Sequence, residues 1–447
     1  MIHDPALETL GREQLAELQR ERLHAVAAYV YDRIGLYRER FDDAGVSSEQ
    51  IRSLDDLRRL PFTRKDDLRD HYPFGLFAVP REDVVRIHGS SGTTGKPTVV
   101  GYTHADLEVF AEVNARSLAM LGAEPGMMLH NAFGYGLFTG GLGLHYGAER
   151  LGMTVVPVSG GMTERQLLLI TDFRPDVIAC TPSYALTLVQ AFEQRGIGPD
   201  EISLRFAVVG AEPWTEAMRA EIDRGLGVKT SNAYGLSEVI GPGVSCECIE
   251  ERNGSHVHED HFLPEVVDPE SGEQLPEGEV GVLVFTALTK QALPLIRYWT
   301  GDLASLSSEP CSCGRTFVRM SPIRGRTDDM LIIRGVNIFP SQVENVLGRV
   351  PELAPHCQLV VSRAGTMDEL EVRTEATSAF FRAVGIDVLS DEAIQADQAV
   401  GELRGRVSGL IKDTTGCTMK VTIVAPGTVP RSEGGKLSRV LDTRSRG

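Results

Sequence analysis

The strongest chemical signal in the chain is a run of small polar residues and glycines that ends in a lysine. Glycine lets the backbone turn so that several N–H groups face one anion, and serine and threonine hydroxyls add further donors. A loop of this kind typically binds a phosphate. The same residues could instead form a plain glycine turn that binds no ligand. The sequence therefore predicts a loop that binds ATP phosphates, formed by Ser90, Ser91, Gly92, Thr93, Thr94, Gly95 and Lys96.

The residues around this loop exclude the Walker type of phosphate loop. Pro97 follows Lys96, so the Ser or Thr that would hold magnesium in the pattern G-x-x-x-x-G-K-[ST] is absent. Proline also favours an extended conformation for the residue before it, so Lys96 does not begin a helix. Strand-like residues at 84–87 and 98–100 flank the loop, and we expect it to join two strands.

Beyond the loop, segments with helical spacing alternate with short segments rich in β-branched residues. Such alternation is typical of an α/β fold with largely parallel sheets. Residues 5–58 also have helical spacing and predict two or three helices. The other expected helices are 105–121, 163–172, 184–195 and 216–224, and the expected strands are 154–158, 177–180 and 206–209.

The pattern changes in the last third of the chain. From residue 265, short strand-like segments between Gly and Pro turns predict a β-rich subdomain. After Asp328 the order is strand, short helix, two strands and a long helix at 391–412, which predicts a small α+β domain. We therefore expect a large N-terminal domain, 1–327, with mixed or parallel sheets flanked by helices, and a C-terminal domain, 328–447.

Composition and charge exclude several classes of protein. The net charge of −17 argues against nucleic acid as a partner, because a phosphate backbone requires a basic face. No apolar run approaches the ~20 residues of a membrane span, and the polar N-terminus is unlike a signal peptide, so we expect a cytoplasmic protein without a membrane. Seven cysteines, an odd number, do not suggest a disulfide framework.

A series of further motifs resembles the adenylate-forming superfamily of acyl-CoA ligases, and most closely the phenylacetate–CoA ligase family. The motifs occur in the family's order along almost the whole chain. Besides the loop they are Tyr72-Pro-Phe-Gly-Leu-Phe-Ala-Val-Pro, Gly134-Tyr-Gly-Leu-Phe-Thr-Gly-Gly-Leu-Gly, Gly210-Ala-Glu-Pro-Trp, Tyr234-Gly-Leu-Ser-Glu, Tyr298-Trp-Thr-Gly-Asp, Gly325-Arg-Thr-Asp-Asp-Met and Pro430-Arg-Ser-Glu-Gly-Gly-Lys.

The resemblance implies an enzyme with two half-reactions, which uses ATP, Mg²⁺ and CoA. A carboxylate attacks the α-phosphate of ATP to give an acyl-adenylate and pyrophosphate, and the CoA thiol then displaces AMP. Lys436 resembles the lysine that bridges the carboxylate and the α-phosphate, and Glu238 resembles the Mg²⁺ ligand. Lys96 would steady the pyrophosphate, and Asp328 resembles the hinge between the two domains.

Further residues resemble the nucleotide and CoA contacts of the family. Asp302 resembles the acid that accepts from the ribose hydroxyls, and Arg326 resembles a second ribose or phosphate contact. Arg334 and Gly335 resemble residues on the CoA side. The other expected nucleotide contacts are Gly210, Ala211, Glu212, Pro213, Asn232, Ala233, Tyr234, Gly235 and Ser237. The four from Gly210 to Pro213 resemble the adenine-side wall, and Tyr234 resembles the residue that stacks on the base.

The acid pocket resembles one that holds an aromatic ring. Its expected wall is Tyr135, Gly136, Phe138, Gly140, Val209, Ala211, Ala233 and Pro242. Phe is more usual in place of Val209, Ile in place of Ala233, and Arg in place of Trp299. The lost volume favours a substituted aryl acid, such as a hydroxy- or aminobenzoate, over phenylacetate itself, although one methylene of space changes specificity by only ~1–3 kcal/mol.

Cysteine and histidine spacing predicts a structural zinc site. The best set of tetrahedral ligands is Cys248, His256, Cys311 and Cys313. Cys246, His258 and His261 are rival ligands, and a set of reduced thiols without metal is the alternative.

Two other functions stay open at the level of sequence. The chain could load its acyl-adenylate onto the pantetheine thiol of a carrier protein instead of free CoA, because both thiols share the same arm. It could also be a non-catalytic ligand sensor, although Glu238, Asp302 and Lys436 form the charge set of phosphoryl chemistry and argue against that. Members of the family are often dimers, so a homodimer is a further expectation.

Overall fold

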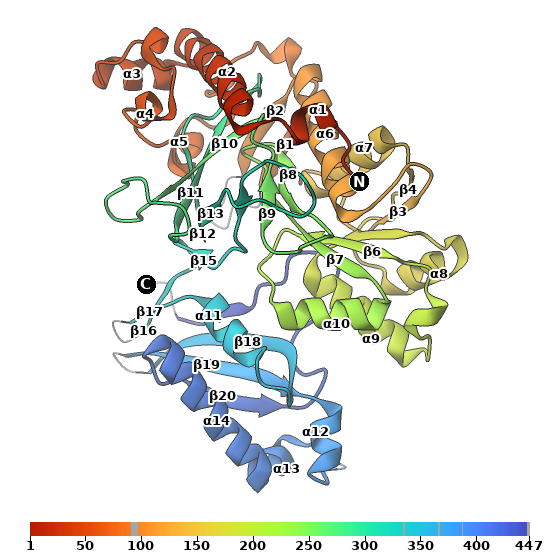
Figure 1. Cartoon of the computed structure of the whole chain (residues 1–447). Coiled ribbons are helices and arrows are strands. Elements are labelled where there is room, and N and C mark those ends of the chain that lie inside the picture. The colour runs from red at the N-terminus through yellow and green to blue at the C-terminus, as the bar shows by residue number, and fades with distance from the viewer. Residues whose placement is uncertain (91–96, 334–335, 365–366, 387, 445–447) are drawn as a thin grey trace. The chain divides into compact units, whose positions relative to one another are not determined.

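The computed structural model describes residues 1–90, 97–333, 336–364, 367–386 and 388–444 (Figure 1). Ser91, Gly92, Thr93, Thr94, Gly95, Lys96, Arg334 and Gly335 therefore lie outside the described residues. Two compact units make up the chain. The first comprises 1–180, 199–211 and 227–322, and the second comprises 181–198, 212–226 and 323–447.

A nine-stranded sheet forms the centre of the first unit. Its buried strands are apolar along their whole length, as expected for parallel strands covered on both faces. The parallel part is β7 (Lys229–Leu236), β6 (Phe206–Gly210), β5 (Val177–Cys180), β3 (Met128–Asn131) and β4 (Thr154–Val156). The antiparallel part is β13 (Leu306–Ser307), β14 (Arg319–Met320), β9 (Ser255–Val257) and β8 (Gly241–Glu247).

Two helices of this unit pack closely against each other. At the start of α6 (His104–Leu121), Thr103 and Asp106 form a capping box. Gly147 of α7 (Gly140–Leu151) lets the two helices touch, because a Cβ there would lie 2.4 Å from the Cβ of Asn114. The other helices of the unit are α1 (Pro5–Glu8), α2 (Arg12–Arg33), α3 (Gly35–Asp43), α4 (Leu54–Leu57), α5 (Lys65–Asp70) and α8 (Thr163–Phe173).

Two smaller antiparallel arrangements complete the first unit. The hairpin of β1 (Arg86–Ser90) and β2 (Thr98–Tyr102) flanks the expected phosphate loop. The expected β-rich region contains β10 (Phe262–Val267), β11 (Gly281–Ala287) and β12 (Tyr298–Ala304), which pair in that order. Their side chains are buried almost throughout, so these strands form a layer with a core of its own.

The second unit has a four-stranded sheet and a large apolar core. The strand order is β20 (Lys420–Val424), β19 (Met367–Ala376), β18 (Leu353–Ala364) and β21 (Val440–Asp442). Its other strands are β15 (Gly325–Arg326), β16 (Leu331–Ile333) and β17 (Val336–Ile338). Its helices are α9 (Pro182–Gln194), α10 (Glu216–Leu226), α11 (Pro340–Leu347), α12 (Ser378–Ala383), α13 (Asp391–Ala396) and α14 (Gln398–Thr415).

One helix boundary expected from the sequence is wrong. The long helix at 391–412 is two helices, because Asp397 has an extended backbone with φ −73° and ψ 137°. Its carboxylate accepts a hydrogen bond from the N–H of Val400 at 3.0 Å and caps α14. An aspartate that caps a helix start therefore interrupts an otherwise continuous apolar pattern.

The fold class is confirmed, whereas the division of the chain differs in detail from the expected one. The large part combines parallel and antiparallel sheets with helices, and the small part is α+β. The second compact unit begins its last segment at residue 323 and also takes in 181–198 and 212–226. The hinge at Asp328 stays a prediction. No helix in the described ranges is long and apolar enough to cross a membrane.

Candidate active site and cysteine–histidine cluster

The hairpin of β1 and β2 carries the expected phosphate loop between its strands. Ser90, the last residue of β1, pairs with Thr98, the first residue of β2, in antiparallel register. Both strands predicted beside the loop are therefore present, although β1 begins two residues later than expected. The Ser90 hydroxyl is buried, and no other described group forms a hydrogen bond with it. A donor held at this position fits a phosphate-binding loop.

Tyr234 and Asp302 meet in the first unit, as expected of two residues that contact one nucleotide. The Tyr234 hydroxyl donates to Oδ2 of Asp302 at 2.6 Å. Asp302 is buried, and its backbone N–H donates to the Thr300 hydroxyl at 3.0 Å, which fixes the turn of β12. A carboxylate oriented by a tyrosine can still accept from the two hydroxyls of a ribose through its other lone pairs.

The carboxyl ends of β6 and β7 hold most of the expected adenine wall. Val209 pairs with Asn232, and Gly210 pairs with Ala233. A Cβ at Gly210 would lie 2.1 Å from the carbonyl oxygen of Ala233, so only glycine fits there. Ala211, the next residue, has φ +74°, which is rare for a residue with a side chain and is typical of functional turns. Ligands of parallel sheets bind at this end of the strands.

The segment from β3 to α7 holds the part of the expected acid pocket that begins at Tyr135 and ends at Gly140. Asn131 Nδ2 donates to the Tyr135 hydroxyl oxygen at 2.8 Å, and that hydroxyl lies 3.1 Å from Nδ1 of His145. Phe138 is half exposed. The Thr139 hydroxyl lies 3.2 Å from that of Ser237, which joins this segment to the Tyr-Gly-Leu-Ser-Glu motif.

Glycine also allows this pocket segment to approach Pro242. A Cβ at Gly143 would lie 2.4 Å from Cγ of Pro242, so α7 packs directly on the proline. Gly235 is in contact with Gly241 in the same way, since a Cβ there would lie 1.8 Å from the carbonyl oxygen of Gly241. The turn around Glu238 is thereby held tightly, and the Glu238 side chain is buried.

In the second unit, Arg326 and Asp328 form a two-point ion pair. Arg326 Nε lies 2.8 Å from Oδ1 of Asp328, and Nη2 lies 3.1 Å from Oδ2. Burial raises the pKa of neighbouring Asp329, and Lys436 acts in the opposite direction. Lys436 and the expected hinge are thus electrostatic neighbours within this unit.

Glu212, which was expected in the adenine wall, also accepts two backbone hydrogen bonds within the second unit. Its Oε1 accepts from the N–H of Ser183 at 2.7 Å, and its Oε2 accepts from the N–H of Leu437 at 3.0 Å. Leu437 directly follows Lys436 in the chain. The carboxylate therefore fixes the backbone beside the expected catalytic lysine, a link that the sequence motifs did not reveal.

Two family models match the chain: AMP-binding enzyme over residues 12–287 and AMP-binding enzyme C-terminal domain over residues 335–444. Phenylacetate–coenzyme A ligase of Thermus thermophilus is 67% identical over 444 residues, which cover 99% of this chain and 100% of that protein. The Escherichia coli enzyme of the same name is 51% identical and covers 99% of this chain and 98% of that protein. The chain belongs to the phenylacetate–CoA ligase family.

Solved structures of acyl-CoA ligases share the fold of this family member. 2-Hydroxyisobutyryl-CoA ligase in its postadenylation state matches with a TM-score of 0.88 and 29% identity, covering 98% of this chain and 91% of that one. The same ligase in its thioesterification state matches with a TM-score of 0.71 and 30% identity, covering 99% and 92%. The predicted family, its fold and the class of AMP-forming acid–thiol ligase are confirmed.

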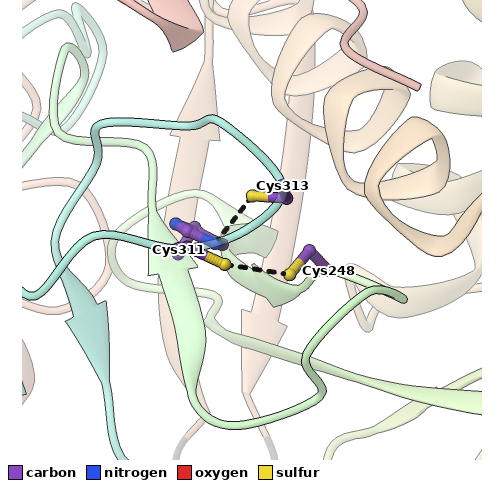
Figure 2. A group of neighbouring side chains, drawn as sticks. Cys248, Cys311 and Cys313 are labelled. Carbon is purple, nitrogen blue, oxygen red and sulfur yellow. Dashed lines mark hydrogen bonds between the residues drawn. The ribbon is translucent and has the colours of Figure 1, made fainter.

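This ligase also brings together the predicted cysteine–histidine set (Figure 2). Ligand atoms of Cys248, His256, Cys311 and Cys313 all lie within 4.8 Å of one another. Cys248 Sγ lies 3.5 Å from Cys311 Sγ, too far for a disulfide bond, and Cys313 Sγ lies 3.4 Å from His256 Nε2. The hydrogen bond with Cys248 and the nearby His256 lower the pKa of the Cys313 thiol, whereas the hydrogen bond with Cys313 raises the pKa of Cys248 and burial raises that of Cys311. Cys313 is therefore the thiol of this cluster that ionises most readily.

The three rival ligands, Cys246, His258 and His261, form their contacts outside the cluster. Cys246 Sγ donates to the carbonyl of Ser117 at 3.6 Å. His258 contacts the hydroxyl of Ser117, and His261 contacts that of Thr289. Cys246 lies within β8, where its thiol also contacts the Ser231 hydroxyl at 3.5 Å, whereas Cys248 lies beyond the end of β8.

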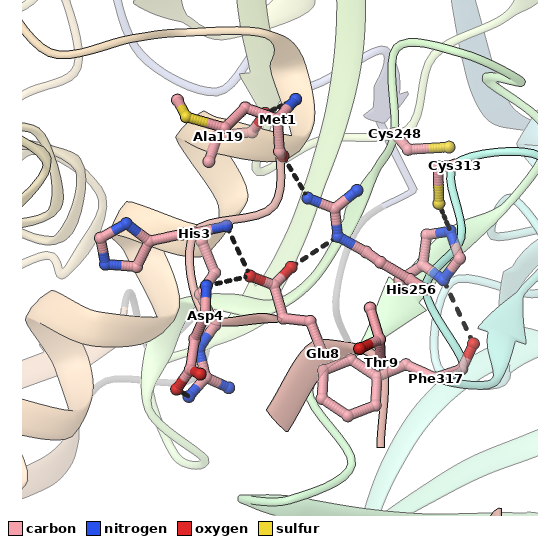
Figure 3. A network of polar contacts seen from close by, with 12 residues as sticks. Met1, His3, Asp4, Glu8, Thr9, Ala119, Cys248, His256, Cys313 and Phe317 are labelled. Atoms are coloured by element: carbon pink, nitrogen blue, oxygen red, sulfur yellow. Dashed lines mark hydrogen bonds and ion pairs between the residues drawn. The ribbon is translucent and has the colours of Figure 1, made fainter. Parts of the chain in front are cut away.

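A polar network beside the cluster was not predicted from the sequence (Figure 3). Arg315 Nε donates to Oε2 of the fully buried Glu8 at 2.5 Å, and Nη2 donates to the carbonyl of Met1 at 2.6 Å. Glu8 Oε1 also accepts from the N–H groups of His3 and Asp4. The N-terminal residues are thereby tied to the loop that carries Cys311 and Cys313. The two charges lie 307 residues apart, so no local pattern could signal the pair.

Lys290 is a second residue that sequence reasoning missed. Its side chain is 3% exposed, and its Nζ lies 3.6 Å from the ring centroid of Tyr102, a cation–π contact. The Tyr102 hydroxyl donates to the carbonyl of Ile240 at 2.8 Å, two residues after Glu238. Burial lowers the pKa of Lys290 to about 8, and Asp106 opposes the shift. Lys290 thus supports the turn beneath the expected magnesium ligand at a cost in stability.

We predict that Lys290→Met changes how stability depends on pH. The unfolded lysine has a pKa of 10.5 and the folded one a pKa of about 8, so the folded chain loses this proton first as pH rises. Burial of the charged lysine lowers the free energy of unfolding by its full amount below pH 8. This loss shrinks as pH rises from 8 and is gone above 10.5. The stability of the variant relative to the original chain should therefore grow by up to about 3 kcal/mol as pH falls from 10.5 to 8.

Chemical denaturation at several pH values measures this difference. The exposed Lys229, substituted in the same way, is the matched control and should give a difference that does not vary over this range. A constant difference for Lys290→Met as well would contradict the lowered pKa.

Proposed function

We propose that the chain joins phenylacetate to coenzyme A through a phenylacetyl-adenylate. One oxygen of the carboxylate attacks the α-phosphorus of ATP, and the bond to pyrophosphate breaks. The CoA sulfur then attacks the acyl carbon, loses its proton, and AMP leaves with the bonding electrons. The observation that carries the choice of acid is the hydrogen bonding of Tyr135, whose hydroxyl accepts from Asn131 and lies 3.1 Å from Nδ1 of His145.

This hydrogen bonding favours an unsubstituted ring over the hydroxy- or aminobenzoates suggested by the sequence. The other expected wall residues are glycine, alanine, valine, proline and phenylalanine, which have no polar side-chain atoms. A ring hydroxyl or amino group would therefore lose its bonds to water without a replacement, which costs about 1–3 kcal/mol. The 67% identity to the Thermus thermophilus phenylacetate–coenzyme A ligase supports the same choice.

The unusual Trp299 does not require a different substrate. Its ring packs edge-on against Phe62 at 5.0 Å between centroids, and the guanidinium of Arg64 lies 4.2 Å from the ring centroid. The pairing of β12 with β11 shifts register between Trp299 and Leu303, and Asp302, which lies in this irregular stretch, is held by Tyr234 instead. Packing of the strand accounts for this tryptophan.

The expected charge set supports the adenylation chemistry. Buried Glu238 would hold Mg²⁺ against the phosphates, where the ion would neutralise charge on the leaving pyrophosphate. Asp302, oriented by Tyr234, would accept from the ribose hydroxyls. Lys436 would bring a positive charge to the α-phosphate, where negative charge increases in the transition state.

A rotation about Asp328 between the half-reactions is part of this proposal. The related 2-hydroxyisobutyryl-CoA ligase has been solved in postadenylation and in thioesterification states, which supports two arrangements in this family. The Arg326–Asp328 ion pair is partly exposed, with side chains 27% and 58% accessible. A pair of this kind contributes little energy, so it would not prevent a change of backbone angles.

We also propose a structural zinc ion in the cysteine–histidine cluster. Tetrahedral Zn²⁺ with bonds of about 2.3 Å places sulfur ligands ~3.8 Å apart, close to the 3.5 Å between Cys248 and Cys311. His256 Nδ1 donates to the carbonyl of Phe317 at 3.2 Å, so the lone pair is on Nε2, the atom that faces Cys313. This is the tautomer that a zinc-binding histidine needs.

One assay tests both the acid and the thiol. With ATP, Mg²⁺ and free CoA, kcat/KM should be at least tenfold higher for phenylacetate than for 4-hydroxybenzoate or 2-aminobenzoate. Release of AMP together with thioester formation measures both steps. A benzoate preferred over phenylacetate would contradict the assignment of the acid. Turnover with a pantetheine-loaded carrier protein but not with free CoA would instead support the carrier-protein alternative.

The second prediction separates the half-reactions at Lys436. Lys436→Ala should slow adenylate formation by ~10²-fold or more, because one transition-state charge donor is removed. Thioester formation from preformed phenylacetyl-adenylate should persist. Exchange of labelled pyrophosphate into ATP reports the first step, and thioester release from supplied adenylate reports the second.

The matched control for Lys436 is Lys420, whose side chain is 71% exposed and pairs with Glu371 at 2.9 Å. Lys420→Ala should leave both rates close to those of the original enzyme. An equal loss of both half-reactions in Lys436→Ala would remove the proposed role of Lys436.

The third prediction concerns the metal. The purified chain should retain about one zinc ion after dialysis against a weak chelator, because three thiolates and one imidazole bind it. Cys313→Ser should lose zinc and lower the melting temperature, since metal binding contributes to folding free energy. Cys246→Ser is the control, because its hydroxyl can keep the bond to Ser117 outside the cluster. A purified protein that is stable without metal would contradict the zinc site and would support a cluster of reduced thiols.

A further inference from the structure

Four polar side chains form a continuous line from β3 to the surface of α7. Asn131 Nδ2 lies 2.8 Å from the Tyr135 hydroxyl oxygen, and that oxygen lies 3.1 Å from His145 Nδ1. His145 Nε2 in turn lies 3.1 Å from Glu149 Oε1. Asn131 is fully buried, whereas the side chain of Glu149 is 55% exposed. The line therefore joins the end of a buried strand to solvent through Tyr135, an expected residue of the acid pocket.

The buried end of the line fixes the orientation of Asn131. Its Nδ2 also donates to the carbonyl oxygen of Gly141 at 2.8 Å, and its Oδ1 accepts from the N–H of Phe133 at 3.3 Å. A backbone carbonyl cannot donate and a backbone N–H cannot accept. The amide of Asn131 is therefore not free to exchange its nitrogen and oxygen, and its NH₂ group must face Tyr135.

The carboxylate of Glu149 at the other end of the line fixes the remaining hydrogens, because a carboxylate accepts and does not donate. Glu149 Oε1 accepts from His145 Nε2, so Nε2 carries the imidazole hydrogen. A neutral imidazole has one acceptor and one donor nitrogen. With the hydrogen on Nε2, Nδ1 is the acceptor, and the Tyr135 hydroxyl donates its hydrogen to it while accepting from Asn131. Burial raises the pKa of Tyr135 to about 12, so its hydroxyl keeps this hydrogen at neutral pH.

We propose that His145 is a positioning residue that sets which ring substituents the acid pocket accepts. By taking the hydrogen of Tyr135, His145 leaves this hydroxyl unable to donate to a bound acid. Tyr135 then presents to the pocket its ring and an oxygen whose hydrogen is already used. This inference rests on the proposed use of phenylacetate and explains how a pocket with a tyrosine selects an unsubstituted ring.

The experiment compares hydroxyphenylacetates with phenylacetate in His145→Leu. Leucine removes the acceptor, so the Tyr135 hydroxyl becomes free to donate into the pocket. The ratio of kcat/KM for the best of 2-, 3- and 4-hydroxyphenylacetate to that for phenylacetate should rise by about 3- to 10-fold, the range that one new hydrogen bond supplies. The same variant with Tyr135→Phe added should lose this gain, because the hydroxyl is then absent.

Two further variants separate positioning from a general effect on the pocket. His145→Asn restores an acceptor near the position of Nδ1 and should return the ratio toward that of the original enzyme. Glu149→Gln leaves Nδ1 as the acceptor and should not change the ratio. A rise in Glu149→Gln as large as in His145→Leu would overturn the proposed direction of the hydrogen bonds.

Tyr135→Phe alone tests the same idea even if His145→Leu does not fold. In the original enzyme the hydroxyl does not reach the acid, so its removal should leave the ratio unchanged. A loss of hydroxyphenylacetate turnover specific to this variant would show that the hydroxyl already binds substrate, and the proposal would fail. An original enzyme that does not use phenylacetate at all would instead contradict the proposed function, independently of the role of His145.

Discussion

The close approach of β6 and β7 at their carboxyl ends is the constraint on which the rest of the candidate site depends. Gly210 has no room for a Cβ because the carbonyl of Ala233 lies against it. The chain can therefore turn at Ala211 with a positive φ directly after the strand, while β7 continues through Tyr234. Tyr234 then reaches Asp302 on β12. One missing methyl group thus allows the expected adenine wall and the expected ribose acid to lie near each other.

Much of this arrangement could be expected from the sequence, because its causes are local. The glycine and serine loop, the β-branched strands and the helical spacing each arise within a few residues, and most expected elements agree with the structure to within two or three residues. The break at Asp397 was also a local signal, since aspartate is a good helix cap, but the apolar pattern continues across it and outweighed that signal.

What could not be expected depends on contacts between distant segments. The cysteine–histidine set was ambiguous in the sequence, because only the fold places Cys246 against Ser117 and Cys248 against Cys311. Glu8 and Arg315, or Glu212 and Leu437, meet only because the chain folds back on itself. Lys290 was missed for a related reason. A lysine next to apolar residues looks exposed in a sequence, and only the packing around Tyr102 buries it.

The hydrogen-bond line of Asn131, Tyr135, His145 and Glu149 shows that residue types alone do not determine what a pocket can bind. A tyrosine in the wall of an acid pocket suggests a donor for polar substrates, and the sequence favoured such acids here. Two backbone groups, the carbonyl of Gly141 and the N–H of Phe133, fix the amide of Asn131 as a donor to Tyr135. At the other end, the carboxylate of Glu149 orients His145 to accept the tyrosine hydrogen, so groups at both ends of the line set the chemical character of the Tyr135 hydroxyl. A related ligase could keep this tyrosine and still accept different ring substituents if the residue that accepts the tyrosine hydrogen were replaced.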